Sequence, residues 1–128
     1  NMVTKNIAII LARGGSKRLP KKNILKLGKK PMIAWSIKAA IDSGKFHRVL
    51  VSTDDKKIAK IAKKYKAEVP FLRLKALDDF STSSMATYYA LLQAEKFWGE
   101  KYETVAQLMA NCPLRTAQDI KKSMLIFN

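Results

Sequence analysis

The chain has 128 residues, 48% of them apolar, and a formal net charge of +15. This length fits one domain, and the apolar fraction is enough to build a hydrophobic core. The charge would suit a nucleic-acid or acidic-membrane binder. However, the lysines are spread over the chain, and aromatic residues do not alternate with them as in a base-stacking surface. We therefore expect neither nucleic acid nor membrane as a partner.

The cysteine and histidine content limits which covalent cross-links and metal sites the chain can form. Cys112 is the single cysteine and His47 the single histidine, so an intrachain disulfide and a zinc-ligand cluster are both excluded. The early apolar run at 7–12 is too short to span a bilayer and ends at Arg13. We expect no signal peptide, no membrane helix and no metal ligands, and a reducing cytoplasm is the simplest setting.

The most informative stretch begins with that apolar run, which predicts a strand covered on both faces. Gly14 and Gly15 follow it and allow successive backbone N–H groups to turn toward one anion. Five cations and no acid then fall within ten residues, at Arg13, Lys17, Arg18, Lys21 and Lys22. The pattern predicts a polyphosphate site, although a tight turn followed by a solvated basic loop has similar ingredients. The spacing fits neither the P-loop nor the dinucleotide fingerprint.

Helical periodicity follows at 31–43. Pro31 suits a first turn and Gly44 a helix end, and the predicted inward face is Ile33, Ile37 and Ile41. A second strand is expected at 49–53. Asp54 or Asp55 can then cap the next helix, whose predicted inward face is Ile58, Ile61, Ala62 and Tyr65.

The remaining elements continue the alternation of strand and helix. A short strand or extended segment is expected at 68–72. Ser83 or Ser84 is expected to cap a helix that ends near residue 98, with Tyr88, Leu91 and Leu92 buried and Phe97 a further candidate. Another strand is predicted at 104–109, and 116–119 resembles a capping box that opens a final helix.

Strands separated by helices predict a three-layer α/β sandwich with a mostly parallel sheet and right-handed crossovers. In such sheets ligands bind beyond the carboxyl ends of the strands. Three stretches with suitable chemistry, 13–23, 54–55 and 111–115, follow predicted strands. We therefore expect them to converge on one site.

The motifs also resemble a known family. Residues 12–23 fit the Ala-Arg-Gly-Gly-Ser-Lys-x-x-Pro-x-Lys-Asn pattern of the cytidylyltransferases that activate nonulosonic sugar acids, and 49–55, 69–73 and 113–116 agree in order and spacing. The resemblance implies a Rossmann-like nucleotide-diphospho-sugar transferase fold. Family members have chains nearly twice as long, so residues 1–128 would be the nucleotide-binding N-terminal part of a single, truncated domain.

The resemblance implies a reaction in which CMP passes from CTP to the anomeric hydroxyl of a nine-carbon sugar acid, with release of pyrophosphate. Such chemistry depends mainly on positioning and charge neutralisation. By resemblance, Lys22 and Arg13 are the expected catalytic residues. The residues expected to bind the triphosphate and ribose are Leu11, Ala12, Arg13, Gly14, Gly15, Ser16, Lys22 and Asn23, while Lys17 and Arg18 could act as a nonspecific screen.

The resemblance also implies where the base and the sugar bind. Arg73 and Ser84, with the backbone near Thr82, would read cytosine, although Arg73 could form a surface ion pair and Ser84 could cap a helix. Arg115 and Met109 are the candidate sugar contacts, and Arg115 could instead brace its loop. Magnesium is expected with CTP, its protein ligands in the C-terminal half that relatives possess, and the full-length form is expected to be a homodimer.

Departures from the family pattern bear on the sugar. Many sialic acid members have glutamine at Met109 and glycine at Arg18, and Phe80 replaces an expected aspartate. The 69–73 stretch followed by Asp-Asp-Phe is more like the pseudaminic acid branch, so we favour a pseudaminic acid substrate, with sialic and legionaminic acids open. The alternative function is a noncatalytic basic module that binds nucleotides or another polyanion.

Overall fold

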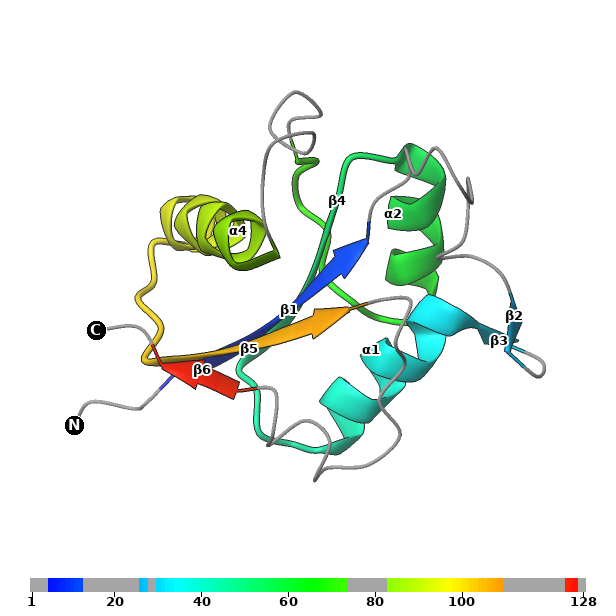
Figure 1. Ribbon diagram of the computed structural model, residues 1–128, viewed down its shortest axis with the longest axis horizontal. Coiled ribbons are helices and arrows are strands. Elements are labelled where there is room, and N and C mark those ends of the chain that lie inside the picture. Colours follow the sequence, from blue (N-terminus) through cyan, green and yellow to red (C-terminus); the bar gives the residue numbers. More distant parts are fainter. Residues whose placement is uncertain (1–4, 13–25, 28–29, 74–82, 110–123, 127–128) are drawn as a thin grey trace.

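In the computed structural model of the chain, the described residues are 5–12, 26–27, 30–73, 83–109 and 124–126. They form a sheet with helices on both faces (Figure 1). The strand order is β4 (Arg48–Thr53), β1 (Asn6–Ala12), β5 (Thr104–Met109) and β6 (Met124–Ile126). The first three strands are parallel and β6 is antiparallel to β5. The mostly parallel sheet is confirmed, while β6 was not predicted.

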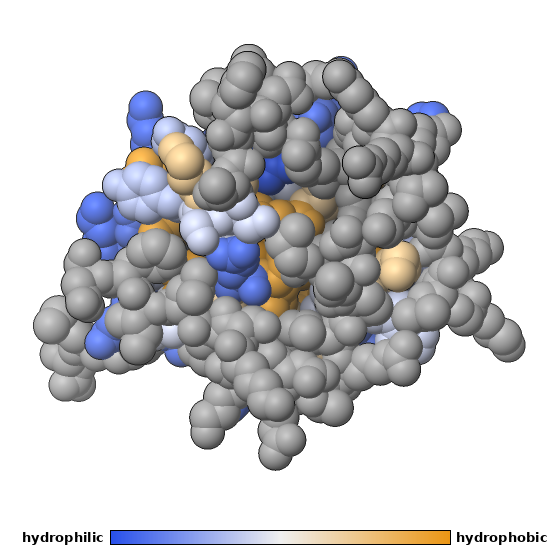
Figure 2. Space-filling view, viewed as in Figure 1, coloured by the Kyte–Doolittle hydropathy of each residue, from blue (hydrophilic) through white to orange (hydrophobic). Residues whose placement is uncertain are grey.

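The sheet has a separate apolar core on each of its faces. Ala8, Ile10 and Ala12 of β1 face α1 (Met32–Asp42) and α2 (Lys56–Lys64), whereas Ile7 and Ile9 face α4 (Ser83–Trp98). This alternation follows from the two-residue period of a strand. Figure 2 shows strongly apolar atoms gathered near the centre of the view. The predicted three-layer sandwich is confirmed.

The first helix is reached through a short antiparallel pair, β2 (Lys26–Leu27) with β3 (Lys30–Pro31). As predicted, Pro31 stands at the start of α1, and Gly44 follows its end with φ of +66°, a conformation that favours glycine. The placement of Ile41 in the core was wrong, since it is 40% exposed. Ala40 is buried instead, because positions four apart drift around a 3.6-residue turn.

Helix α2 begins at a side-chain cap. The Asp55 carboxylate accepts hydrogen bonds from the backbone N–H groups of Lys57 (2.7 Å) and Ile58 (3.3 Å), which satisfies two donors that a helix start leaves open. Asp55, rather than Asp54, is therefore the cap of the two predicted candidates. On the inward face, Ile58 and Ala62 are buried, while Ile61 and Tyr65 are only partly buried.

We predict that Asp55→Ala lowers the free energy of unfolding by about 1 kcal/mol, because both amides lose their acceptor. Asp55→Asn keeps an acceptor oxygen, so its free energy of unfolding is expected to fall by less than half the amount expected for Asp55→Ala. Urea unfolding of both variants beside the wild type measures the difference. Equal stability of the alanine variant and the wild type would contradict the capping role.

Helix α4 differs from prediction in the face that it buries. Leu91 is buried as expected, but Tyr88, Leu92 and Phe97 are 48%, 43% and 56% exposed. The sheet is instead contacted by small residues, chiefly Ala86, Ala90 and Ala94. The helix begins at Ser83, so Ser83 and Ser84 lie in its first turn, and the cap position falls at residue 82, outside the described residues.

Two further predictions concern the remaining segments. Of the stretch at 68–72, Glu68 forms an isolated parallel bridge with Leu50 of β4, while Pro70 and Phe71 lie in a bend, so the predicted extended segment is present only at its start. The predicted helix that opens at 116–119 lies outside the described residues. Within the described part of the chain, no helix combines the length and apolar character needed to cross a bilayer.

Candidate nucleotide site

The candidate site lies at the carboxyl ends of β1, β4 and β5. Leu11 lies opposite Ser52 of β4 and Met109 of β5, and Ala12 lies opposite Thr53. Leu11 and Ala12 are 5% and 1% exposed, so their side chains belong to the core and only their backbone is available for a ligand. The carboxyl ends of β1, β4 and β5 therefore lie side by side. Of the three stretches predicted to converge there, only 54–55 belongs to the described residues, so their convergence on one site stays a prediction.

Thr53 organises this edge, and the sequence analysis did not identify it. Its side chain is fully buried. Its hydroxyl accepts a hydrogen bond from the backbone N–H of Asp55 (3.1 Å), and its carbonyl accepts one from the backbone N–H of Arg73 (2.8 Å). One residue therefore connects the strand end, the start of α2 and the Arg73 segment. The available signal was a hydroxyl residue directly before two aspartates at the end of an apolar strand.

Arg73 is held at the same edge. The segment that leads to it runs beside β4 through hydrogen bonds from Glu68 N–H to the Val49 carbonyl (2.9 Å) and from Val51 N–H to the Glu68 carbonyl (3.1 Å). Arg73 itself is only 5% exposed. Arg73 is therefore a buried residue rather than a surface one, and the alternative that it forms an ion pair is not tested by the described residues. Buried arginines are rare and need polar partners, so this placement is compatible with the predicted recognition role, which stays a prediction.

The other predicted residues are placed unevenly. Ser84 is exposed in the first turn of α4, and Met109 is the last residue of β5. The remaining predicted residues lie outside the described part of the chain, so the structure does not test their roles: Arg13, Gly14, Gly15, Ser16, Lys17, Arg18, Lys22, Asn23, Thr82 and Arg115.

Metal-binding side chains do not gather in the described part of the chain, where no three His, Cys, Asp or Glu residues form a group suited to a metal ion. The Asp55 carboxylate is already engaged by two amides of α2. Of the readings open for Asp55, helix capping is the one the geometry supports.

The strongest electrostatic cluster lies at the opposite end of the sheet. Glu100 accepts hydrogen bonds from Lys5 Nζ (2.8 Å), Arg48 Nε (2.6 Å) and Tyr102 Oη (2.9 Å), and its Oε2 lies 2.8 Å from His47 Nε2. These contacts, first among them the one with Lys5, hold the pKa of Glu100 well below its usual range. Burial and the bond to Glu100 raise the pKa of Tyr102. The cluster joins the amino ends of the strands and is separate from the candidate site.

The described residues form a mostly parallel α/β sheet that holds Thr53 and Arg73 at the carboxyl edge of its parallel strands, and solved structures share this fold. The chain is similar to CMP:2-keto-3-deoxy-manno-octonic acid synthetase complexed with CTP, with a TM-score of 0.72 and 22% identity over 93% of this chain and 45% of that one. It is also similar to a cytidylyltransferase from Leptospira borgpetersenii, with a TM-score of 0.69 and 27% identity over 94% and 47%.

Residues 7–125 match the family model for cytidylyltransferases, and the chain belongs to this family. It is 41% identical over 119 residues to pseudaminic acid cytidylyltransferase of Campylobacter jejuni strain 81-176, covering 93% of this chain and 51% of the relative. It is 38% identical over 120 residues to CMP-N,N'-diacetyllegionaminic acid synthase of Legionella pneumophila, covering 94% and 52%. The chain thus spans about half the length of these curated relatives.

Proposed function

We propose that the chain is the nucleotide-binding N-terminal part of a CTP-dependent cytidylyltransferase that transfers CMP to a nonulosonic sugar acid. The observation that carries the proposal is the family match over residues 7–125, which includes each stretch that borders the candidate site. The geometry supports it, because Leu11, Ala12, Thr53 and Arg73 lie at one edge of a parallel sheet, where ligands of such folds bind.

The proposed reaction is a displacement at phosphorus. The anomeric oxygen of the sugar acid forms a bond to the α-phosphorus of CTP, the bond from that phosphorus to the bridging oxygen breaks, and pyrophosphate leaves while the hydroxyl proton is released. The chain's contribution is to hold the triphosphate and offset its charge. We assign this role to the stretch that follows β1 in the sequence, with Arg13, Ser16 and Lys22 on the phosphates and Asn23 on the ribose.

The base-binding side is assigned to Arg73 and Ser84, with backbone near Thr82. Cytosine presents an amino donor beside carbonyl and ring-nitrogen acceptors, so rigidly held donors and acceptors can distinguish it from uracil. Arg73 is suited to this work because its backbone is fixed to Thr53 and its side chain is buried. A rigid, dry position strengthens the discrimination of hydrogen-bonding partners.

We propose that magnesium binds together with CTP. As the family resemblance implies, its protein ligands would come from the C-terminal half that relatives possess, and it would also bind phosphate oxygens. When bound, the ion would neutralise phosphate charge.

For the sugar, we favour pseudaminic acid or a related bacterial nonulosonate, with Arg115 and Met109 as candidate contacts. The 41% identity to a pseudaminic acid cytidylyltransferase supports this choice. The 38% identity to a CMP-N,N'-diacetyllegionaminic acid synthase makes legionaminic acid the next candidate. Turnover of a full-length form with each of the three sugar acids would distinguish them. We further propose a cytoplasmic location, the simplest setting for a chain with a single cysteine, and a homodimeric full-length form, which the family resemblance implies.

The proposed specificity predicts a larger thermal shift with CTP than with UTP, ATP or GTP, each added with magnesium. Replacing Arg73 by Met, which has a similar length but no hydrogen-bond donors, is expected to reduce the CTP shift to the size of the UTP shift. The unfolding temperature of the ligand-free variant controls for damage to the fold. Equal shifts for all four nucleotides with the wild-type chain would contradict the cytosine site.

The high net charge of +15 favours a second candidate, the noncatalytic polyanion-binding module. That function predicts binding without preference for CTP and a steep loss of affinity with added salt. The same nucleotide comparison, repeated at two salt concentrations, separates the two candidates.

A further inference from the structure

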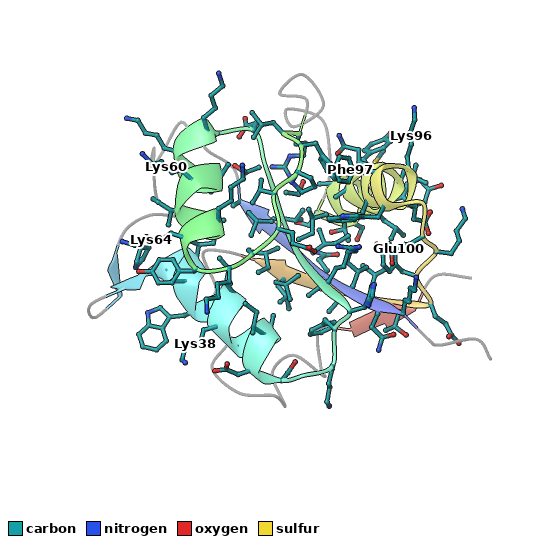
Figure 3. The ribbon with its side chains drawn as sticks, turned by 180° about the vertical axis from the view of Figure 1, so that it is seen from behind. Lys38, Lys60, Lys64, Lys96, Phe97 and Glu100 are labelled. Atoms are coloured by element: carbon teal, nitrogen blue, oxygen red, sulfur yellow. The ribbon has the colours of Figure 1, made fainter. Side chains whose placement is uncertain are left out.

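The described lysines of α2 form one continuous face. Since an α-helix turns by about 100° per residue, Lys56, Lys57, Lys60, Lys63 and Lys64 fall within an arc of about 120°. All five are exposed, and Figure 3 shows Lys60 and Lys64 pointing outward from the helix, away from the sheet. We call these five residues the α2 lysine face. None of them forms an ion pair in the described part of the structure.

Acidic partners are concentrated elsewhere. Ion pairs between described residues cluster toward the amino ends of the strands, where Glu68, Glu95 and Glu100 pair with Arg48, Lys101 and Lys5. Asp42, in the last turn of α1, pairs with Lys38. At the start of α2 the nearest acid, Asp55, is engaged in capping the helix. Among the described residues, ion pairs therefore gather near the amino ends of the strands, and the five positive charges of the α2 lysine face exceed the two negative charges of Asp54 and Asp55 at the start of the helix.

The position of this face relates it to the candidate site. The first turn of α2 directly follows Asp55, two residues beyond Thr53 at the carboxyl end of β4, and Thr53 holds Arg73. Lys64 lies about 12 Å along the helix axis from Lys56. The face thus begins beside the candidate nucleotide site and extends away from it. Like charges so placed repel one another and generate a positive field that reaches beyond contact distance, especially at low ionic strength.

We propose that the α2 lysine face is an electrostatic guide that speeds the capture of the anionic nucleotide, and this inference rests on the proposed function. The lysines act at a distance and do not hold the bound ligand. Charges of this kind change the association rate and its salt dependence far more than the dissociation rate.

The test is a stopped-flow measurement of the rate at which the chain binds CTP in the presence of magnesium. It is made at ionic strengths of 20 mM and 300 mM, where the Debye length is about 20 Å and about 6 Å. The variant Lys60→Gln/Lys63→Gln/Lys64→Gln removes three charges from the face, and glutamine has a helix propensity close to that of lysine. We expect about a threefold slower association at low ionic strength, an unchanged dissociation rate, and convergence with the wild type at high ionic strength.

The matched control is Lys45→Gln/Lys96→Gln/Lys101→Gln, which removes the same net charge near the amino ends of the strands. Its association rate is expected to stay close to that of the wild type. If both triple variants slow association equally, or neither does, while the wild type binds CTP, the guide is refuted and the proposed function stands. If the wild type does not bind CTP, the proposed function fails and the guide fails with it.

Discussion

A full-length form that carries Lys22→Ala is expected to turn over about 10²–10³-fold more slowly than the wild type, the usual cost of losing one preorganised charge-stabilising group. Lys22 belongs to the cationic stretch that follows β1 in the sequence. In the proposed reaction, negative charge builds on the α-phosphate and on the leaving pyrophosphate. A fixed ammonium group at that point lowers the barrier more than it strengthens binding of CTP, so kcat should fall more than KM rises.

Steady-state release of pyrophosphate, with CTP and the sugar acid varied separately, measures this effect. Lys17→Ala is the matched control, because it removes the same charge from the same stretch of sequence at a residue for which only nonspecific screening is expected. Its turnover should fall less than tenfold. Undiminished turnover of Lys22→Ala, with the unfolding temperature unchanged, would remove Lys22 from the mechanism.

Glu100→Gln is expected to produce the largest loss of stability, about 2–4 kcal/mol. The Glu100 side chain is 9% exposed and faces Lys5, His47 and Arg48. Arg48 is itself mostly buried and stacks 4.1 Å from the centre of the Trp98 ring. Loss of the carboxylate charge would leave Lys5 and Arg48 poorly compensated at a place where several chain segments meet.

Chemical denaturation at pH 7 measures the loss, with Glu95→Gln as the control. Glu95 lies 3.5 Å from Lys101, whose side chain is 89% exposed, so its replacement should cost less than about 0.5 kcal/mol. Because the pKa of Glu100 is lowered in the folded state, its contribution is fully present above the unfolded carboxyl pKa of about 4.3 and is lost progressively as pH falls from there toward the folded pKa. The stability difference between wild type and Glu100→Gln should therefore shrink steadily as pH is lowered from about 5 to about 3.

Local signals predicted much of the fold. The apolar run of β1, the turn at Gly44 and the cap at Asp55 each depend on a few adjacent residues, and the structure contains all three. The parallel pairing followed from the alternation of strands and helices. The convergence of strand ends at the candidate site then followed from topology alone.

The errors occurred where distant parts of the chain decide the outcome. Helix α4 carries apolar residues on both faces, so periodicity could not choose between the alanine face and the face with Tyr88 and Leu92. The sheet selected the alanines, whose small side chains allow close approach. The Glu100 cluster was not predicted because its members come from separate segments, with Lys5 and Glu100 95 positions apart. The short strand β6 has only three residues and offers little pattern.

The central claim is that the carboxyl edge of β1, β4 and β5 binds CTP. A crystal structure of the chain with CTP and magnesium tests it most directly. We predict triphosphate density beside the residues that follow Ala12, with cytosine within hydrogen-bond distance of Arg73. Density for CTP at the amino ends of the strands, near Glu100, or a cytosine ring remote from Arg73, would contradict the claim.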